Sequence, residues 1–194
     1  NIPRGDFDKI TQTAGGYNNA NTSQDRTYYF ELFPSNQIEL GLWLESERLV
    51  HLRIDSTGVE TQRAVVKEER KQSYDNRPYG SWMEKTMQKA FLVHPYKWTP
   101  IGYPEDLNRA TLQEFIDFHS IYYVPNNATL SIAGDLDIES TKKMIEKYFG
   151  DIPRGTKEMY RPSIVEPEKT AEVTDTVYDN IQLPAVIMSY HMPA

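Results

Sequence analysis

The sequence predicts an α+β fold with a mostly antiparallel sheet and helices packed on one face. Residues 27–33 are rich in aromatic and β-branched residues, which favours a strand, and the small, polar segment 17–22 is close enough to pair with it as an antiparallel hairpin. Segments with apolar residues at helical spacing, such as 37–48 and 138–149, lie between the strands in blocks. With 194 residues, of which 39% are hydrophobic, the chain can bury a core.

The remaining elements follow from the same patterns. A helix begins near Val59 and ends before residues 76–80, because proline disfavours helix in the residue before it and glycine breaks the pattern. Three prolines predict an ordered loop without regular structure at 94–104. Thr111 and Glu114 have the spacing of a capping box. Further helices are expected at 6–13, 82–91 and 112–121, and further strands at 128–133, 171–178 and 183–190.

Composition excludes several classes of function. The formal net charge is −7, and no basic stripe alternates with aromatic residues, so we expect no nucleic-acid partner. The chain has no cysteine, which excludes disulfides, thiolate metal sites and a cysteine nucleophile. No apolar run approaches the ~18 residues that a membrane span needs. Localisation stays open, because a chain without cysteine or targeting segment suits the periplasm or cell envelope as well as the cytoplasm.

Residue chemistry alone gives no complete active site. No two of the four histidines stand three or four residues apart, so no helix supplies a pair of imidazole ligands. There is no G-x-S-x-G motif and no glycine-rich loop before a helix. The charged run around Glu68 is typical of a solvated helix face, and the alternative is that this glutamate points inward as a metal ligand.

Motifs along nearly the whole chain are similar to the pitrilysin/insulinase family of zinc metalloproteases, the inverzincins. They occur in that family's order: a Gly-Gly-x-x-Asn-Ala-x-Thr segment, a Thr-x-Tyr-Tyr strand, a glutamate-bearing helix and a Tyr-x-Pro-Asn-Asn segment. In this sequence these are residues 15–22, 27–29, 63–70 with 76–80, and 122–130 with 134–135.

The resemblance implies a zinc site to which this chain contributes one ligand. The family's H-x-x-E-H helix provides two histidine ligands and a general-base glutamate, and a later glutamate completes the site. Glu68 matches that later glutamate. The chain contains no H-x-x-E-H, so we expect the general base upstream of Asn1, no catalytic residue within this chain, and zinc in a longer parent protein rather than in this piece. The piece by itself is predicted to be inactive.

The resemblance also implies a peptide-binding strand. Asn19, Ala20 and Asn21 match the family's edge strand, which pairs with the substrate backbone by β-augmentation. Without the resemblance, the segment YNNANT would be interpreted as a polar loop. The implied partners are a peptide or unfolded polypeptide and a second homologous half-domain or sister subunit.

We therefore interpret residues 1–194 as one truncated pitrilysin-like half-domain. Its portion 1–125 would hold the metal helix and substrate strand, and 126–194 would begin the following strand–helix portion. Two alternatives remain open: a non-catalytic family subunit that binds peptides or a partner chain, and an unrelated acidic α+β binding module with a chance match.

Overall fold

The structure is a computed structural model that describes residues 2–3 and 5–192. The chain divides into two compact units, each made of two stretches of sequence. Asn1–Asp55 and Thr111–Met159 form unit 1, and Ser56–Ala110 and Tyr160–Ala194 form unit 2. The predicted division of the chain into portions 1–125 and 126–194 stays a prediction. In the described part of the chain, no helix is both long and apolar enough to cross a membrane.

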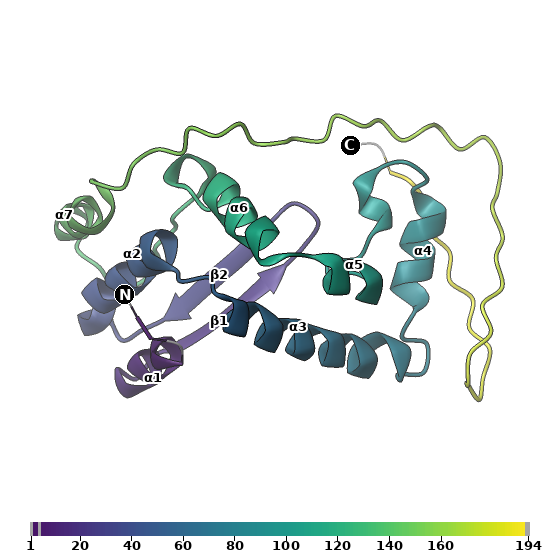
Figure 1. The fold of residues 1–194 in the computed structure, drawn as a ribbon, viewed down its shortest axis with the longest axis horizontal. Coiled ribbons are helices and arrows are strands. Elements are labelled where there is room, and N and C mark those ends of the chain that lie inside the picture. The colour runs from purple at the N-terminus through teal and green to yellow at the C-terminus, as the bar shows by residue number, and fades with distance from the viewer. Residues whose placement is uncertain (1, 4, 193–194) are drawn as a thin grey trace. The chain divides into compact units, whose positions relative to one another are not determined.

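Unit 1 is a hairpin supported by helices (Figure 1). Its elements are α1 (Asp6–Thr13), β1 (Tyr17–Thr22), β2 (Thr27–Leu32), the 3₁₀ turn η1 (Ser35–Gln37), α2 (Ile38–His51), α6 (Leu112–Tyr122), the 3₁₀ turn η4 (Pro125–Asn127) and α7 (Ile138–Phe149). The side chain of Leu44 in α2 is fully buried. The Thr111–Glu114 capping box at the start of α6 is confirmed, because each residue bonds the other's backbone N–H.

Unit 2 is built on a long helix. Its elements are α3 (Ser56–Arg70), the π-helix η2 (Lys71–Asp75), α4 (Trp82–Ala90), the 3₁₀ turn η3 (Pro95–Lys97) and α5 (Pro104–Arg109). Residues 160–192 follow without a helix or strand (Figure 1). The helix predicted from Val59 begins three residues earlier, at Ser56. The expected loop 94–104 contains η3 and reaches the start of α5, because proline fits the first position of a helix, where no N–H partner is needed.

The predicted fold class is confirmed, because helices accompany an antiparallel sheet, but three of the expected strands do not form. Among the described residues the only sheet is the two-stranded pair β1–β2, and segments 128–133, 171–178 and 183–190 have no strand structure. Alternation shows that a segment could present one apolar face. A strand also needs a neighbouring backbone to receive its hydrogen bonds, and alternation cannot supply that neighbour.

A carboxylate fastens the irregular segment 160–192 to the rest of unit 2. Glu166 accepts hydrogen bonds from the backbone N–H groups of Leu92, Val93 and His94, at 2.6, 3.0 and 2.8 Å. Partial desolvation of the carboxyl acts to raise its pKa, but the three amides outweigh that and lower the pKa of Glu166 to about 2. This contact keeps the segment attached where no regular element does so.

A buried ion pair joins two helices of unit 2. Nη2 of Arg70, in α3, lies 2.8 Å from Oε2 of Glu84, in α4, and Nη1 donates to the carbonyl of Gly102 at 2.8 Å. Arg70 and Glu84 are only 8% and 6% exposed. Removing one charge therefore leaves the other buried without its partner.

We predict that Arg70→Leu destabilises the chain by about 3–5 kcal/mol, the cost of leaving one member of a buried ion pair uncompensated. Urea unfolding followed by circular dichroism measures the change. Arg109→Leu is the matched control, because Arg109 pairs with Asp106 at 3.0 Å on an exposed surface and its loss should change little. Equal effects of the two variants would contradict the prediction.

Candidate peptide-binding edge

The hairpin leaves the outer edge of β1 open. β1 and β2 are antiparallel, with Thr22 opposite Thr27 and Tyr17 opposite Leu32, which confirms the predicted hairpin. Among the residues that the structure describes, β1 has no partner strand on its other side. Asn19, Ala20 and Asn21 lie in sequence along this edge and are exposed.

The register decides which backbone groups face outward. The N–H of Ser23 donates to the carbonyl of Arg26 at 2.8 Å, so these residues form a hydrogen-bonded pair at the end of the ladder. Along an antiparallel hairpin, hydrogen-bonded pairs alternate with pairs whose backbone groups point away from the partner strand. The pairs of Asn19 with Phe30 and Asn21 with Tyr28 therefore bond to each other, whereas Ala20, opposite Tyr29, directs its N–H and C=O to the free edge.

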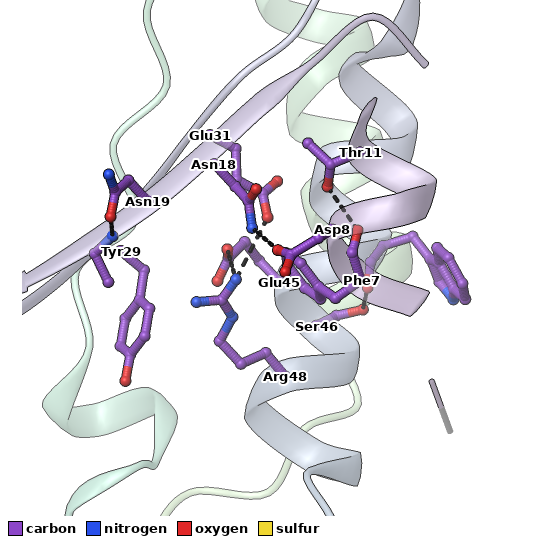
Figure 2. A network of polar contacts seen from close by, with 12 residues as sticks. Phe7, Asp8, Thr11, Asn18, Asn19, Tyr29, Glu31, Glu45, Ser46 and Arg48 are labelled. Atoms are coloured by element: carbon purple, nitrogen blue, oxygen red, sulfur yellow. Dashed lines mark hydrogen bonds and ion pairs between the residues drawn. The ribbon is translucent and has the colours of Figure 1, made fainter. Parts of the chain in front are cut away.

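A side chain occupies the outward amide of Ala20. Its N–H donates to Oδ1 of Asn19 at 2.8 Å, and the Nδ2 of Asn19 donates to the hydroxyl of Tyr17 at 2.7 Å. Figure 2 shows the Asn19 side chain with its hydrogen bond to the neighbouring backbone amide. An incoming strand that paired here would replace the Asn19 oxygen as the acceptor of this N–H.

The two faces of the hairpin differ. Because side chains alternate along a strand, Tyr17, Asn19, Tyr28 and Phe30 share one face, where the rings of Tyr28 and Phe30 stack at 5.6 Å. The other face carries Asn18, Tyr29 and Glu31 and lies against α1 and α2 (Figure 2). There Asn18 donates to Asp8 of α1 at 2.8 Å.

Two carboxyls and one guanidinium meet between β2 and α2 (Figure 2). Nη2 of Arg48 lies 3.6 Å from Oε1 of Glu31 and 3.2 Å from Oε1 of Glu45, and the Glu31 side chain is only 7% exposed. The Arg48 guanidinium also lies over the rings of Phe7 and Tyr29, at 4.3 and 4.4 Å. A Cβ at Gly41 of α2 would stand 3.1 Å from the ring of Phe33, which is tight, and 3.4 Å from Oε2 of Glu31, which is ordinary contact.

Burial keeps Glu31 protonated near neutral pH. Burial is the largest cause, the hydrogen bond and charge of Glu45 add to it, and Arg48 opposes it, so the pKa of Glu31 rises to about 8. Neither carboxyl oxygen of Glu31 has a donor partner in the structure. A proton on one of the two carboxyls supplies the donor that this pair otherwise lacks.

Tyr29 extends the contacts of β2 to the end of α6. Its hydroxyl forms a hydrogen bond of 2.9 Å with the hydroxyl of Tyr123, and burial together with this bond raises its pKa. The ring of His119 stacks on Tyr123 at 4.8 Å, and burial lowers the pKa of His119. Arg48 of α2 and Tyr123, the residue after α6, thus contact Tyr29 on the covered face of the hairpin.

Glu68 lies on α3 in unit 2, on an exposed side of the helix. Its carboxylate stands 3.6 Å from Nζ of Lys71 and accepts a hydrogen bond of 3.3 Å from Gln72. These are contacts of a solvated face with spacings of three and four residues. They leave the carboxylate accessible, and its role as a metal ligand stays a prediction.

The described residues do not make a zinc site by themselves. Nowhere between residues 2 and 192, apart from the undescribed position 4, do three His, Cys, Asp or Glu side chains stand together in a way that could hold a metal. Protein zinc sites use three or four such ligands. Glu68 can therefore supply one ligand at most, and no chemical step can be assigned to zinc in this chain.

Sequence reasoning missed the Glu31–Glu45–Arg48 cluster. One signal was available: Glu31 is the single charged residue of the strand TYYFEL, and alternation places it on the same face as Tyr29. A carboxyl on the covered face of an aromatic strand needs a partner. The sequence does not tell which residue of the following helix provides it.

Comparison with known proteins identifies relatives over the whole chain. A family model described as "Peptidase M16 inactive domain" matches residues 109–194. The zinc protease PqqE of Helicobacter pylori is 34% identical over 100% of this chain, and a probable mitochondrial-processing peptidase subunit beta of Schizosaccharomyces pombe is 25% identical over 94%. The chain spans 44% and 41% of these relatives, less than half of each.

Solved structures agree in fold. A crystal structure of a protease from Helicobacter pylori superposes with a TM-score of 0.83 at 34% identity, over 86% of this chain and 40% of that one. The first half of the periplasmic protease PqqL from Escherichia coli superposes with a TM-score of 0.64 at 21% identity, over 77% of this chain and 33% of that one. This second likeness concerns the fold alone.

We predict that Asn19→Ala speeds hydrogen exchange of the Ala20 amide roughly fivefold, as expected from losing a hydrogen bond worth about 1 kcal/mol. Amide exchange measured by NMR tests this. The amide of Asn21, which faces β2, is the internal control and should keep its rate. An unchanged rate at Ala20 would show that its N–H is protected by something other than the Asn19 side chain.

Proposed function

The chain belongs to the peptidase M16 family, and from this premise we propose that it forms the substrate-binding part of a zinc metalloendopeptidase that hydrolyses peptide bonds. Several of the relatives that match it are named zinc proteases. Because the chain spans less than half of the curated relatives, the activity is proposed for a longer parent protein. The observation that carries the proposal is the open edge of β1.

The open edge suits an extended peptide. Ala20 turns its N–H and C=O away from β2, and by the same alternation so do Asn18 and Thr22. A peptide that adds as a strand bonds to these main-chain groups, so its side chains contribute little to recognition. Such a surface fits a protease that accepts varied, unfolded polypeptides.

We assign to Glu68 the role of one zinc ligand in the parent protein. Its carboxylate is exposed and makes only surface contacts, so binding a metal would not require breaking a buried interaction. The other ligands and the general base would come from residues outside the described chain. A second half-domain or sister subunit is proposed as partner, in line with the structural relative that is itself the first half of a protease.

One observation favours a second candidate function. The family model that matches residues 109–194 carries the description of an inactive domain. A non-catalytic subunit would bind peptides or a partner chain through the same β1 edge and would hold no zinc. The two candidates therefore share the peptide site and differ at Glu68.

We expect Ala20→Pro to abolish peptide binding while the hairpin stays folded, because proline removes an N–H that the β1–β2 ladder does not use. The probe is a fluorescein-labelled unstructured peptide of about ten residues, measured by fluorescence anisotropy. Ala20→Ser keeps the N–H and is the matched control. The same peptide with alternate backbone nitrogens methylated should bind neither protein.

Binding that survives in Ala20→Pro, with circular dichroism showing an intact fold, would rule out pairing at this edge. Loss of binding in both Ala20→Pro and Ala20→Ser would point to side-chain packing rather than to the backbone N–H.

In the full-length protein, we expect Glu68→Gln to weaken zinc binding by at least about tenfold, since even changes to groups that only orient a ligand cost 10–100-fold. Zinc per chain is measured by mass spectrometry after dialysis against a zinc buffer. Glu69→Gln, the exposed neighbour on the same helix, is the control. If full-length wild-type protein binds no zinc, the non-catalytic subunit is the correct function.

A further inference from the structure

The β1 edge rests on a contact between β2 and α2 that has too few donors. Glu31 and Glu45 together bring two carboxyls, and Arg48 is the one cation within salt-bridge distance of either among the described residues. With both carboxyls ionised, the cluster would carry a net charge of −1. The Glu31 side chain is 7% exposed, so water cannot offset that charge well.

The carboxyl oxygens of Glu31 and Glu45 also lack hydrogen-bond donors. Both oxygens of Glu31 and Oε1 of Glu45 are buried without a hydrogen-bond donor in the structure. Arg48 lies 3.6 Å from Glu31, too far for a good hydrogen bond, because its guanidinium also covers the rings of Phe7 and Tyr29. The Glu45 side chain is 25% exposed, so the buried carboxyl that needs a proton is Glu31. A proton on Glu31 makes it a donor to Glu45 and removes the excess charge.

We infer that a proton on Glu31, held against the carboxyl of Glu45, positions the β1 edge for peptide by holding β2 against α2. The inference rests on the proposed peptide-binding function. Glu31 and Glu45 are positioning residues here, since neither touches the edge itself. The strand register connects these residues to the β1 edge. Glu31 is opposite Asn18, and Tyr29, whose ring Arg48 covers, is opposite Ala20.

Other ionisable groups lie near Glu31 and Glu45 on α1, β2, α2 and α6. Asp8 of α1 bonds Asn18, and Tyr29 of β2 bonds Tyr123 beyond the end of α6. On α2, Glu47 pairs with His51 at 3.1 Å. His119 of α6 stacks on Tyr123, and its lowered pKa keeps it neutral above pH 7. None of these supplies a cation to Glu31, so loss of the proton leaves repulsion between two carboxylates.

The direction of the pH effect follows from the two states of Glu31. Its pKa is raised from an ordinary 4.5 to about 8 in the folded chain. The stabilisation that this proton gives the folded chain is fully present below pH 4.5 and is lost as the pH rises through about 8. Between them the folded chain holds a proton that the unfolded chain lacks, so the unfolding constant rises by at most about tenfold per pH unit.

The experiment measures two quantities on the 194-residue chain from pH 5 to 9.5. Hydrogen exchange of the Asn19 and Asn21 amides, which face β2, reports opening of the hairpin. Anisotropy of the fluorescein-labelled peptide reports binding at the edge. We expect the hairpin to open more readily above pH 8, after correction for the intrinsic exchange rate, and peptide affinity to fall about tenfold, the equivalent of one pKa unit of coupling.

Three variants identify the titrating pair. Glu31→Gln keeps a neutral group with a donor at the same place, so both profiles should become flat with affinity retained at high pH. Glu45→Gln removes the second negative charge and should shift both transitions to lower pH. His51→Gln and Glu139→Gln, the second an exposed partner of Lys142, are controls that should keep the wild-type profiles.

The outcomes separate this inference from the proposed function. If peptide binds with the same affinity at all pH values in wild type and Glu31→Gln, the inference is wrong and the peptide site stands. If hairpin opening follows pH through Glu31 but no peptide binds at any pH, Glu31 does hold the proton. The role of that proton in positioning the edge is then wrong, and so is the proposed peptide site. A pH-dependence that disappears in His51→Gln and persists in Glu31→Gln also overturns the inference.

Discussion

The guanidinium of Arg48 stands at the point where three elements of unit 1 meet. It reaches the carboxyls of Glu31 and Glu45 and covers the aromatic rings of Phe7 and Tyr29, so one side chain of α2 contacts both α1 and β2. A two-stranded hairpin is marginal in water without a supporting layer. The placement of β1, and with it the open edge, therefore depends on this contact.

The hairpin is asymmetric in a way that suits binding. Its covered face is fixed by charged and aromatic contacts from α1, α2 and the end of α6, whereas the outer backbone of β1 has no strand beside it in the described chain. Unpaired edges invite association with other chains. Asn19 moderates this, because its side chain bonds the amide of Ala20 and can be displaced by an incoming strand at little cost.

The residues proposed for peptide recognition and for metal binding lie in different units of the chain. The residues of the edge lie on one strand of unit 1, and Glu68 lies on α3 of unit 2. The edge has all of its backbone groups within one strand, so peptide binding can be studied on this chain. One carboxylate cannot hold zinc usefully. Hydrolysis thus requires the longer protein, and that requirement separates the proposed enzyme from the non-catalytic alternative.

The sequence by itself determined the local structure. Aromatic and β-branched residues specified β2, apolar spacing specified α2 and α7, and Thr111 with Glu114 specified the start of α6, because these signals act within a few residues. The polar segment YNNANT carries no such signal, and its closeness to β2 in the sequence predicted the hairpin that places Asn19, Ala20 and Asn21 on a strand. Their side chains and backbone direction follow from strand alternation once the register is known.

Only the tertiary structure decided what needs a partner far along the chain. Segment 128–133 alternates as a strand should, but no backbone among residues 2–3 and 5–192 pairs with it. Arg70 and Glu84 look like surface charges in sequence, and packing of α3 against α4 buries them together. Glu31 needed Glu45 and Arg48 to acquire its raised pKa, because a pKa depends on the burial and charges that folding brings around the group.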